Sequence, residues 1–297
     1  MLRDVKQGSY FTEKELRFLS RCVLCPRKCR VNRVAGEIGY CKTGLLPVVS
    51  SYNLHFGEEP PISGFRGSGT IFFTHCNMRC IYCQNYPISQ LGVGKEVTIE
   101  RLAKMMLELQ SRGAHNINFV TPSHLTVQII AATRLARDEG LKIPIVYNTS
   151  GYDSLFQLRL LEGIVDIYLA DMRYSDNKIS LRYSDAPDYV EVNRRAIKEM
   201  HRQVGDLECD SEGIAKRGLI IRHLVLPEGY SGSEEIFNFL AKEVSKNTYV
   251  SLMSQYFPAY RAPEDPIIGR RITQREYDLA RAAMLSSGLK NGWIQEM

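Results

Sequence analysis

From residue 68 onward, the sequence alternates between short apolar runs and longer segments with helical periodicity. Such alternation is typical of a parallel sheet covered by helices, and right-handed crossovers curl that sheet into a barrel or partial barrel. We therefore predict an α/β core over residues 61–297. The predicted strands are 70–74, 117–120, 143–147, 165–170, 219–226 and 249–253. The predicted helices are one between the cap Thr98 and Gly113, and then 124–139, 153–161, 188–203, 233–245 and 273–287.

Residues 1–60 stand outside this alternation and contain too few regularly spaced apolar residues to build a core alone. One short amphipathic helix is predicted over Phe11–Arg21. The segment that follows carries four cysteines with the spacing C-x2-C-x3-C-x11-C, namely Cys22, Cys25, Cys29 and Cys41. Four thiolates make a complete tetrahedral set, which suits a structural zinc ion or an auxiliary 4Fe-4S cluster. We predict a small cysteine-rich metal-binding lobe over residues 1–60.

Composition and chain start favour a folded cytoplasmic protein without a membrane partner. The chain is 44% hydrophobic and 24% charged, and no apolar run approaches the roughly 18 residues of a membrane span. The start MLRDVKQGSY lacks the apolar core of a signal peptide. Clustered cysteines in a chain without an export signal indicate metal or redox chemistry rather than structural disulfides. Cys209, alone in a polar stretch, is expected to take no part.

Positive charge is concentrated near the start of the chain. Residues 1–50 contain 10 Lys and Arg against 4 Asp and Glu, whereas the remaining residues contain 28 against 29. A basic lobe contacts an acidic partner or a nucleic acid, or is simply a solvated surface, which is the commoner case. The near-neutral remainder argues against a nucleic-acid partner.

A second cysteine motif follows the first predicted strand directly. Cys76, Cys80 and Cys83 have the spacing C-x3-C-x2-C. They lie where the strand ends, at the edge of an α/β sheet that usually carries the chemistry. Three thiolates are one short of a closed zinc site, whereas a cluster held by three cysteines leaves one iron open to a ligand. A zinc knuckle with a fourth ligand elsewhere is the structural alternative.

This triad, with the aromatic Tyr82 before its last cysteine, resembles the radical S-adenosylmethionine (radical SAM) superfamily over residues 62–297. The segments NINFVTPSH, YNTSGY and RHLVLP, with Cys22-x2-Cys25-Pro-Arg-x-Cys29, resemble pyruvate formate-lyase activating enzyme-like (PflX-like) iron–sulfur proteins. The resemblance implies a partial (β/α)6 barrel, and a 4Fe-4S cluster on the triad whose open iron chelates S-adenosylmethionine. Reductive cleavage of that cofactor would yield a 5′-deoxyadenosyl radical that abstracts hydrogen from a substrate.

The resemblance also implies several contacts to S-adenosylmethionine. Tyr82 would lie near the adenine, and the loop with Asn148 and Ser150 resembles a ribose-binding corner. Asp171 and Arg173 stand where activating enzymes have Asp-x-Lys, so Arg replaces Lys in this chain. Arginine keeps the charge but differs in shape and hydrogen bonding, so the two are not equivalent.

Two further positions bear on the methionine end of the cofactor. Arg222 and His223 are neighbours on one predicted strand, so only one of them faces the interior. We expect this to be Arg222, because a buried arginine needs an anion and the cofactor carboxylate is a candidate. Many members of the superfamily have Gly-Gly-Glu after the second strand, where this chain has Thr-Pro-Ser-His at 121–124.

These features predict an enzyme, with its substrate left open. The first hypothesis is an activase-like radical enzyme that acts on a glycyl radical enzyme or another protein. The second is a radical enzyme with the same core that acts on another peptide, a small metabolite or RNA. The third is a non-catalytic iron–sulfur or zinc sensor. Either enzyme would need an external electron donor such as flavodoxin or ferredoxin.

Overall fold

The structure is a computed structural model that describes residues 10–297. The chain start used above to predict the absence of a signal peptide therefore lies almost wholly outside the described residues. In the part of the chain that is described, no helix is both long and apolar enough to cross a membrane.

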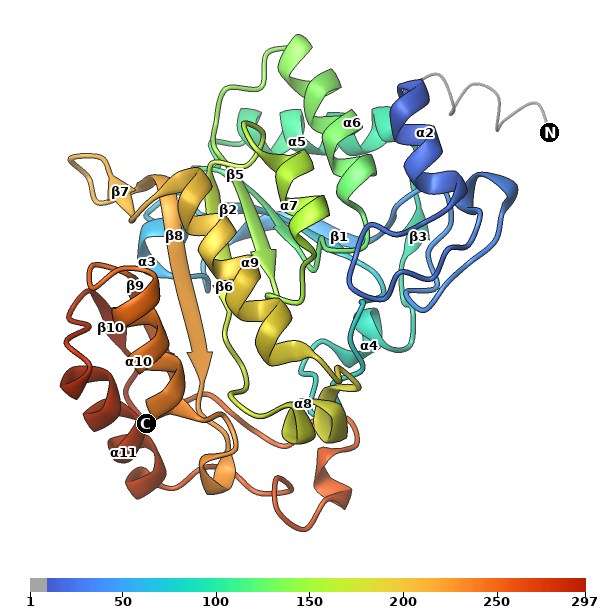
Figure 1. Cartoon of the computed structure of the whole chain (residues 1–297). Coiled ribbons are helices and arrows are strands. Elements are labelled where there is room, and N and C mark those ends of the chain that lie inside the picture. Colours follow the sequence, from blue (N-terminus) through green and yellow to red (C-terminus); the bar gives the residue numbers. More distant parts are fainter. Residues whose placement is uncertain (1–9) are drawn as a thin grey trace.

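A single sheet of ten strands forms the centre of the molecule (Figure 1). Its strands are β1 (Val48–His55), β2 (Ser68–Phe73), β3 (Lys95–Glu96), β4 (Ile117–Val120), β5 (Ile145–Thr149), β6 (Ile167–Asp171), β7 (Glu208–Cys209), β8 (Ala215–Leu224), β9 (Tyr249–Met253) and β10 (Gly292–Ile294). Their order is β10-β9-β8-β6-β5-β4-β2-β1-β3, and β7 pairs with β8 beside this path. The path has two ends, so the sheet is not closed.

The six predicted strands are the parallel part of this sheet. They correspond to β2, β4, β5, β6, β8 and β9, and each pairs in parallel with the next in that order. The prediction of an α/β fold with a partial barrel is confirmed. The sheet is wider than predicted, because β1 and β3 add antiparallel strands at one edge and β10 adds a parallel strand at the other.

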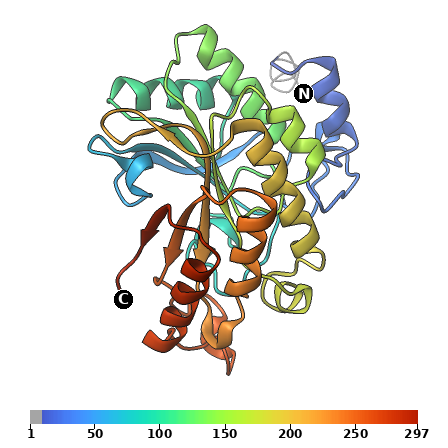
Figure 2. The ribbon, with the colours of Figure 1, turned by 60° about the vertical axis from the view of Figure 1, so that its left-hand side comes forward.

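Helices follow the strands in the predicted alternation. They are α2 (Glu13–Ser20), α3 (Pro60–Ser63), α4 (Tyr86–Ser89), α5 (Ile99–Ser111), α6 (Thr126–Asp138), α7 (Leu155–Leu161), α8 (Asn177–Ser184), α9 (Tyr189–Val204), α10 (Ser233–Glu243) and α11 (Gln274–Ser286). Thr98 caps α5 as predicted, because its side chain accepts a hydrogen bond from the backbone N–H of Arg101. Figure 2 shows the large helices along one side of the sheet.

The strands of the barrel have two different buried faces. On one face, residues such as Tyr168 pack with the apolar sides of the helices in the main core. On the other face, Val146, Leu169 and Ile220 form a smaller cluster with Ile62 of α3. Because side chains alternate along a strand, Asp171 and Arg222 lie on this second, inner face, above the apolar layer. The segment with α3 therefore fills one end of the barrel interior.

The first 60 residues are divided between a lobe and the sheet. Although β1 lies within the predicted lobe range, it pairs with β2 over six positions. The lobe before β1 rests on the barrel helices (Figure 2). Arg134 of α6 forms an ion pair with Glu15 of α2 at 2.9 Å, and the amide of Gln128 donates to the carbonyl of Leu45 at 2.7 Å. Such partly buried polar contacts fix the position of the lobe.

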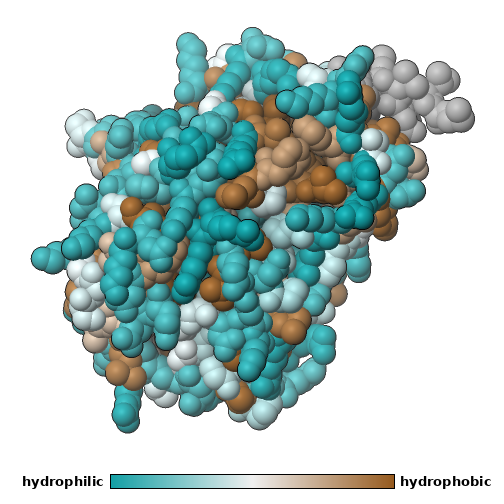
Figure 3. Space-filling view, viewed as in Figure 1, coloured by the Kyte–Doolittle hydropathy of each residue, from teal (hydrophilic) through white to brown (hydrophobic). Residues whose placement is uncertain are grey.

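Apolar side chains contribute to the same junction. Phe18 of α2 meets Phe156 of α7 edge to face, with ring centroids 5.1 Å apart. Figure 3 shows apolar residues gathered on the upper part of this face, where the lobe meets α7.

Candidate active site

The loop with the cysteine triad begins at the carboxyl end of β2 and packs against α8. Backbone N–H groups of Arg79 and Ile81 donate to the carbonyls of Ser184 and Tyr183, at 3.0 and 2.9 Å. Helix α8 was not among the predicted helices, because its eight residues are mostly polar and it lies between a strand and a longer helix. The structure shows that α8 determines where the triad loop lies.

Each triad sulfur has a hydrogen-bond donor beside it. The backbone N–H of Met78 lies 3.3 Å from Cys76 Sγ, and the hydroxyl of Ser89 lies 3.0 Å from Cys83 Sγ. Cys80 Sγ has two donors, the hydroxyl of Ser184 at 3.0 Å and Nη1 of Arg173 at 3.3 Å. Hydrogen bonds from charged or polar donors stabilise thiolates, which are the form that binds metal.

The donor set fits the cluster that the triad predicts. Burial raises the pKa of the Cys76 thiol to about 12 and also raises the pKa of Cys83, so free thiols stay protonated at neutral pH. Iron binding offsets that cost, because a bound metal deprotonates its thiol ligands. Among the described residues, no three His, Cys, Asp or Glu side chains are arranged to hold a single metal ion. A 4Fe-4S cluster does not require the three sulfurs to meet at one ion, since each cysteine binds its own iron.

A solvent-connected cavity of about 180 Å³ lies beside the triad. One wall comes from the triad loop and the other from the ends of β6, β8 and β9. Its lining residues are Tyr82, Cys83, Gln84, Asn85, Asp171, Arg173, Arg222, Leu224, Met253 and Gln255. The structure thus brings four of the six predicted cofactor contacts, Tyr82, Asp171, Arg173 and Arg222, into one cavity.

The other two predicted contacts lie differently. Asn148 is buried behind the cavity wall, where its Oδ1 accepts a hydrogen bond from Arg222 Nη2 at 2.6 Å. The side chain of Ser150 is absent from the cavity wall, and its backbone carbonyl accepts from the hydroxyl of Tyr189 at 2.8 Å. The cofactor contacts proposed for all six residues remain predictions.

Arg222 faces the barrel interior, where it already has protein anions beside it. Its Nε donates to Asp171 Oδ1 at 2.8 Å, and its Nη1 lies 3.7 Å from a carboxylate oxygen of Glu58. Burial alone would raise the pKa of Asp171, but Arg222 and Arg173 hold that pKa below its usual value. The buried charge of Arg222 therefore does not by itself require a cofactor carboxylate.

Glu58 and Glu59 are site residues that sequence analysis missed. They follow β1, at the amino end of the barrel, and reach the strand ends from inside. Burial raises the pKa of both carboxyls, that of Glu59 to about 7, against the opposing charge of Arg222. The only local signal was two adjacent acids before Pro60-Pro61, which reads as an ordinary exposed turn.

Several polar atoms on the inner face have no hydrogen-bond partner within the described residues. They are both amide atoms of Asn118, Oε2 of Glu59 and the hydroxyl of Ser251. Ser251 lies directly beside Arg222 in the pairing of β8 with β9. Buried polar groups are normally paired, so this interior suits a polar ligand with several hydrogen-bonding atoms. S-adenosylmethionine has such atoms.

Tyr82 and Arg173 connect the triad loop to the opposite wall. The hydroxyl of Tyr82 lies 2.5 Å from that of Tyr174, and its ring meets Tyr256 edge to face at 5.8 Å. Arg173 Nε donates to Asp171 Oδ2 at 2.9 Å while Nη1 reaches Cys80 Sγ. The guanidinium thus bridges a carboxylate and a cluster-binding sulfur, a contact that the single nitrogen of a lysine makes less well.

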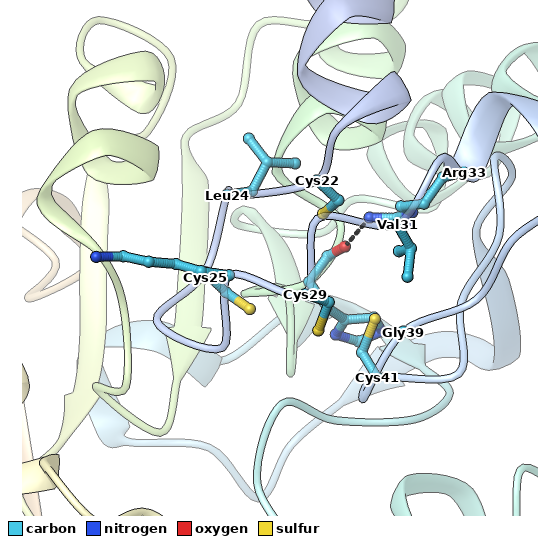
Figure 4. Close-up of a pocket in the computed structure, with 10 residues that line it drawn as sticks. Cys22, Leu24, Cys25, Cys29, Val31, Arg33, Gly39 and Cys41 are labelled. Carbon is cyan, nitrogen blue, oxygen red and sulfur yellow. Dashed lines mark hydrogen bonds between the residues drawn. The ribbon is translucent and has the colours of Figure 1, made fainter.

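The four lobe cysteines line a separate and much smaller cavity. Figure 4 shows their sulfur atoms turned toward a common space. The structure therefore brings Cys22, Cys25, Cys29 and Cys41 together, and metal binding there remains a prediction. Cys209 is exposed on β7, away from both groups.

Comparisons with known proteins agree with this geometry. The family model described as Radical SAM superfamily matches residues 70–206. An uncharacterized protein of Methanocaldococcus jannaschii is 34% identical over 271 residues, which cover 87% of this chain and 72% of that protein. The pyruvate formate-lyase-activating enzyme of Clostridium pasteurianum is 27% identical over 113 residues, covering 36% of this chain and 46% of the enzyme.

A solved structure shares the fold at low sequence identity. The FeFe-hydrogenase maturase HydG superposes with a TM-score of 0.51 and 12% identity, over 75% of this chain. The match spans only half of the HydG chain. This likeness concerns the arrangement of strands and helices.

Proposed function

This chain belongs to the radical SAM superfamily, and from that premise we propose that it is an activase-like enzyme that abstracts hydrogen from a protein substrate. Membership implies a 4Fe-4S cluster and S-adenosylmethionine as cofactors. The observation that carries the proposal is the cysteine triad at the carboxyl edge of the parallel sheet, beside a cavity lined by Asp171, Arg173 and Arg222.

The protein residues have distinct roles in this proposal. Cys76, Cys80 and Cys83 hold the cluster. When bound there, the cluster supplies the electron that cleaves a carbon–sulfur bond of S-adenosylmethionine. Arg173 donates to Cys80 Sγ and fixes the orientation of Asp171. Placing charged groups around a buried site before the reaction avoids the cost of rearranging them during it.

The polar interior positions the cofactor. Arg222 and Asp171 form a buried ion pair that offers its remaining hydrogen-bonding sites to the amino and carboxylate groups of the methionine part. Tyr82 supplies an aromatic wall for the adenine, and Asn148 and Ser150 are the proposed contacts of the ribose. Arg222, Asp171 and Tyr82 line the cavity beside the triad loop, where they would hold the cofactor close to the cluster.

A peptide substrate fits the rim of the cavity. Gln84 of one rim loop donates to the carbonyl of Gln255 on the other at 3.1 Å. Farther along the second loop, Phe257 and Tyr260 are 39% and 37% exposed, and Tyr260 stacks on Tyr86. Aromatic side chains are enriched at protein–protein interfaces, which supports a protein substrate at this rim. The similarity to a pyruvate formate-lyase-activating enzyme supports the same class of substrate.

Two further components belong to the proposal. An external one-electron donor such as flavodoxin or ferredoxin would reduce the cluster. The four cysteines of the lobe would hold a second metal centre, either zinc or an iron–sulfur cluster.

Anaerobic turnover tests this function. The reconstituted, reduced protein is mixed with S-adenosylmethionine, and 5′-deoxyadenosine is measured. We expect product from the wild type and a loss of at least about 100-fold in Cys80→Ala, because that variant lacks one iron ligand. The matched control is Cys209→Ala, which removes an exposed cysteine and should keep full activity.

The outcomes separate the hypotheses. No 5′-deoxyadenosine from wild-type protein with a full, reduced cluster would contradict the enzymatic proposal and favour a sensor. The substrate class is tested by adding a glycyl radical enzyme and recording its EPR spectrum. An organic radical on the added protein supports the activase proposal. Cofactor cleavage without such a radical favours another peptide or a small molecule.

A further inference from the structure

The cavity of the N-terminal lobe is built by backbone turns that bring four thiols together. The N–H of Cys22 donates to the carbonyl of Val31 at 2.9 Å, and the N–H of Arg30 donates to the carbonyl of Cys22 at 2.7 Å. This pairing closes the loop that contains Cys25 and Cys29. The backbone N–H of Tyr40 lies 3.4 Å from Cys29 Sγ and lines up the return segment with Cys41.

Gly39 allows the return segment to approach. A Cβ at this position would lie 2.8 Å from Cys29 Cβ and 2.9 Å from Cys29 Sγ, which is closer than carbon atoms or sulfur tolerate. In the sequence this glycine stands two residues before Cys41. In the structure it lines the same cavity as the four sulfurs (Figure 4).

The cavity also contains a buried positive charge. Arg33 is 1% exposed and lines the cavity with the cysteines. Its Nε donates to the carbonyl of Gly44 at 2.8 Å and its Nη1 to the carbonyl of His124 at 2.9 Å. Both partners are neutral carbonyls. Within residues 10–297, Nη2 has no hydrogen-bond partner, and no carboxylate forms an ion pair with Arg33.

A buried guanidinium without an anion is costly, because the desolvation penalty of a charge is several kcal/mol unless an opposite charge offsets it. The cysteine thiols that line the same cavity are groups that can become anionic. Four thiolates around Zn²⁺, or around an oxidised 4Fe-4S core of charge +2, leave a net charge of −2. Such a centre provides the anion that Arg33 lacks.

His124 connects the same cavity to the triad loop. His124 is 2% exposed and also lines the cavity, and its Nδ1 has no partner within the described residues. Its Nε2 lies 3.0 Å from the carbonyl of Thr74, two residues before Cys76. The imidazole therefore spans from the lobe cavity to the backbone that leads into the triad loop.

We propose that Cys22, Cys25, Cys29 and Cys41 bind a dianionic 4Fe-4S cluster, in which each cysteine holds its own iron, and that Arg33 is its buried counter-cation. This inference deepens the second-centre part of the proposed function. Through Arg33 and His124, the centre fastens the lobe to the loop that carries the triad. The centre helps to hold that loop in position and adds negative charge near it.

Metal analysis of a triad-free chain tests the site. The variant Cys76→Ala/Cys80→Ala/Cys83→Ala, purified anaerobically at full length, should retain four iron and four sulfide per chain. Adding Cys25→Ala should remove that iron, and adding Cys209→Ala should leave it. A triad-free chain without iron, or with one zinc ion in its place, overturns the proposed cluster. Cofactor cleavage by the wild type is measured separately, so failure of the radical chemistry and failure of this site are distinguishable.

Arg33 is tested by the rate at which a chelator removes the metal. In the triad-free background, Arg33→Met should release metal about 10- to 100-fold faster, as for other groups that support metal ligands. Arg33→Lys restores the charge and should recover most of the retention, which a purely steric role would not predict. Arg30→Met, at an exposed arginine of the same loop, is the control.

The reduction potential of the cluster gives a second readout. Loss of a nearby cation disfavours the reduced, more negative state, so Arg33→Met should shift the potential to a more negative value, and Arg33→Lys should not. Equal release rates and potentials in Arg33→Met and its parent would overturn the counter-cation role.

Discussion

In the barrel interior, the protonation state of each ionisable residue depends on the charges of its neighbours. Three carboxyls, those of Glu58, Glu59 and Asp171, share the positive charges of Arg222 and Arg173. Asp171 bonds directly to both arginines, and its pKa is lowered. Glu58 and Glu59 lack such close pairing, and burial raises their pKa values. The interior is thus one coupled ionic network in which proton uptake falls on the two glutamates.

The pH dependence of stability tests this network. The pKa of Glu59 is raised from 4.5 to about 7, so the folded chain binds a proton that the unfolded chain has released. Stability is therefore lost as pH rises from about 4.5 through 7. We expect Glu59→Gln to gain up to about 3 kcal/mol relative to wild type between pH 5 and pH 8, at about 1.36 kcal/mol per pKa unit.

Urea unfolding at a series of pH values measures this difference. Glu139→Gln, at an exposed position after α6, serves as the control and should follow the wild-type curve. Parallel curves for Glu59→Gln and wild type would show that Glu59 does not titrate in this range.

At the scale of elements, the site depends on how the loop after β5 packs against β6 and α9. Gly151 has φ of +73°, and its carbonyl accepts a hydrogen bond from the Asn193 amide at 3.2 Å. The same amide donates to the carbonyl of Asp171 at 3.0 Å. One side chain of α9 therefore fixes the end of β6 and the loop beside it, which together orient Asp171.

Replacing Gly151 should disturb this junction. A Cβ there would lie 2.2 Å from Asn193 Nδ2 and 2.4 Å from the Asp171 carbonyl. We expect Gly151→Ala to lower the free energy of unfolding by more than about 2 kcal/mol, and to reduce cofactor cleavage.

The control is Gly163→Ala. Gly163 has a similar φ of +78°, but nothing lies within 4 Å of an added Cβ. Gly163→Ala should lower the free energy of unfolding by only about 1 kcal/mol, because alanine is strained in the left-handed conformation. Equal losses in the two variants would assign the Gly151 effect to backbone strain rather than to packing against Asn193.

At the scale of the whole molecule, the lobe and the barrel meet at the triad loop. Arg27, between two lobe cysteines, donates from Nε to the carbonyl of Asn77 at 2.8 Å and from Nη2 to that of Asp185. Its guanidinium also lies 3.8 Å from the ring centre of Tyr40. One side chain thus contacts the lobe, the triad loop and the end of α8.

Hydrogen exchange tests whether these parts are coupled. We expect Arg27→Ala to speed amide exchange roughly 30-fold in residues 22–41 and 76–83 alike, because about 2 kcal/mol of charged hydrogen bonding is lost. Strands β5 and β6 should be unaffected. Arg30→Ala is the matched control at an exposed site. Faster exchange in the lobe alone would contradict the coupling.

Local pattern determined the order and type of the main elements and the place of both cysteine groups. The apolar runs of β4 and β9 and the cap at Thr98 are properties of neighbouring residues, so sequence was sufficient for them. Cys76, Cys80 and Cys83 follow a strand and have the spacing C-x3-C-x2-C, and this local motif was sufficient to recognise the family. The same three cysteines are the residues that would hold the cluster.

Only the tertiary structure decided which distant groups share the site. Glu58 reaches Arg222 because the segment with α3 enters the barrel, and Ser184 reaches Cys80 because α8 packs under the triad loop. Likewise, the sequence pattern placed the residues of β1 in the lobe, whereas in the structure β1 pairs with β2. Such contacts depend on strand pairing and packing between residues far apart in the chain. Long-range pairing and packing produce no periodic pattern in the local sequence.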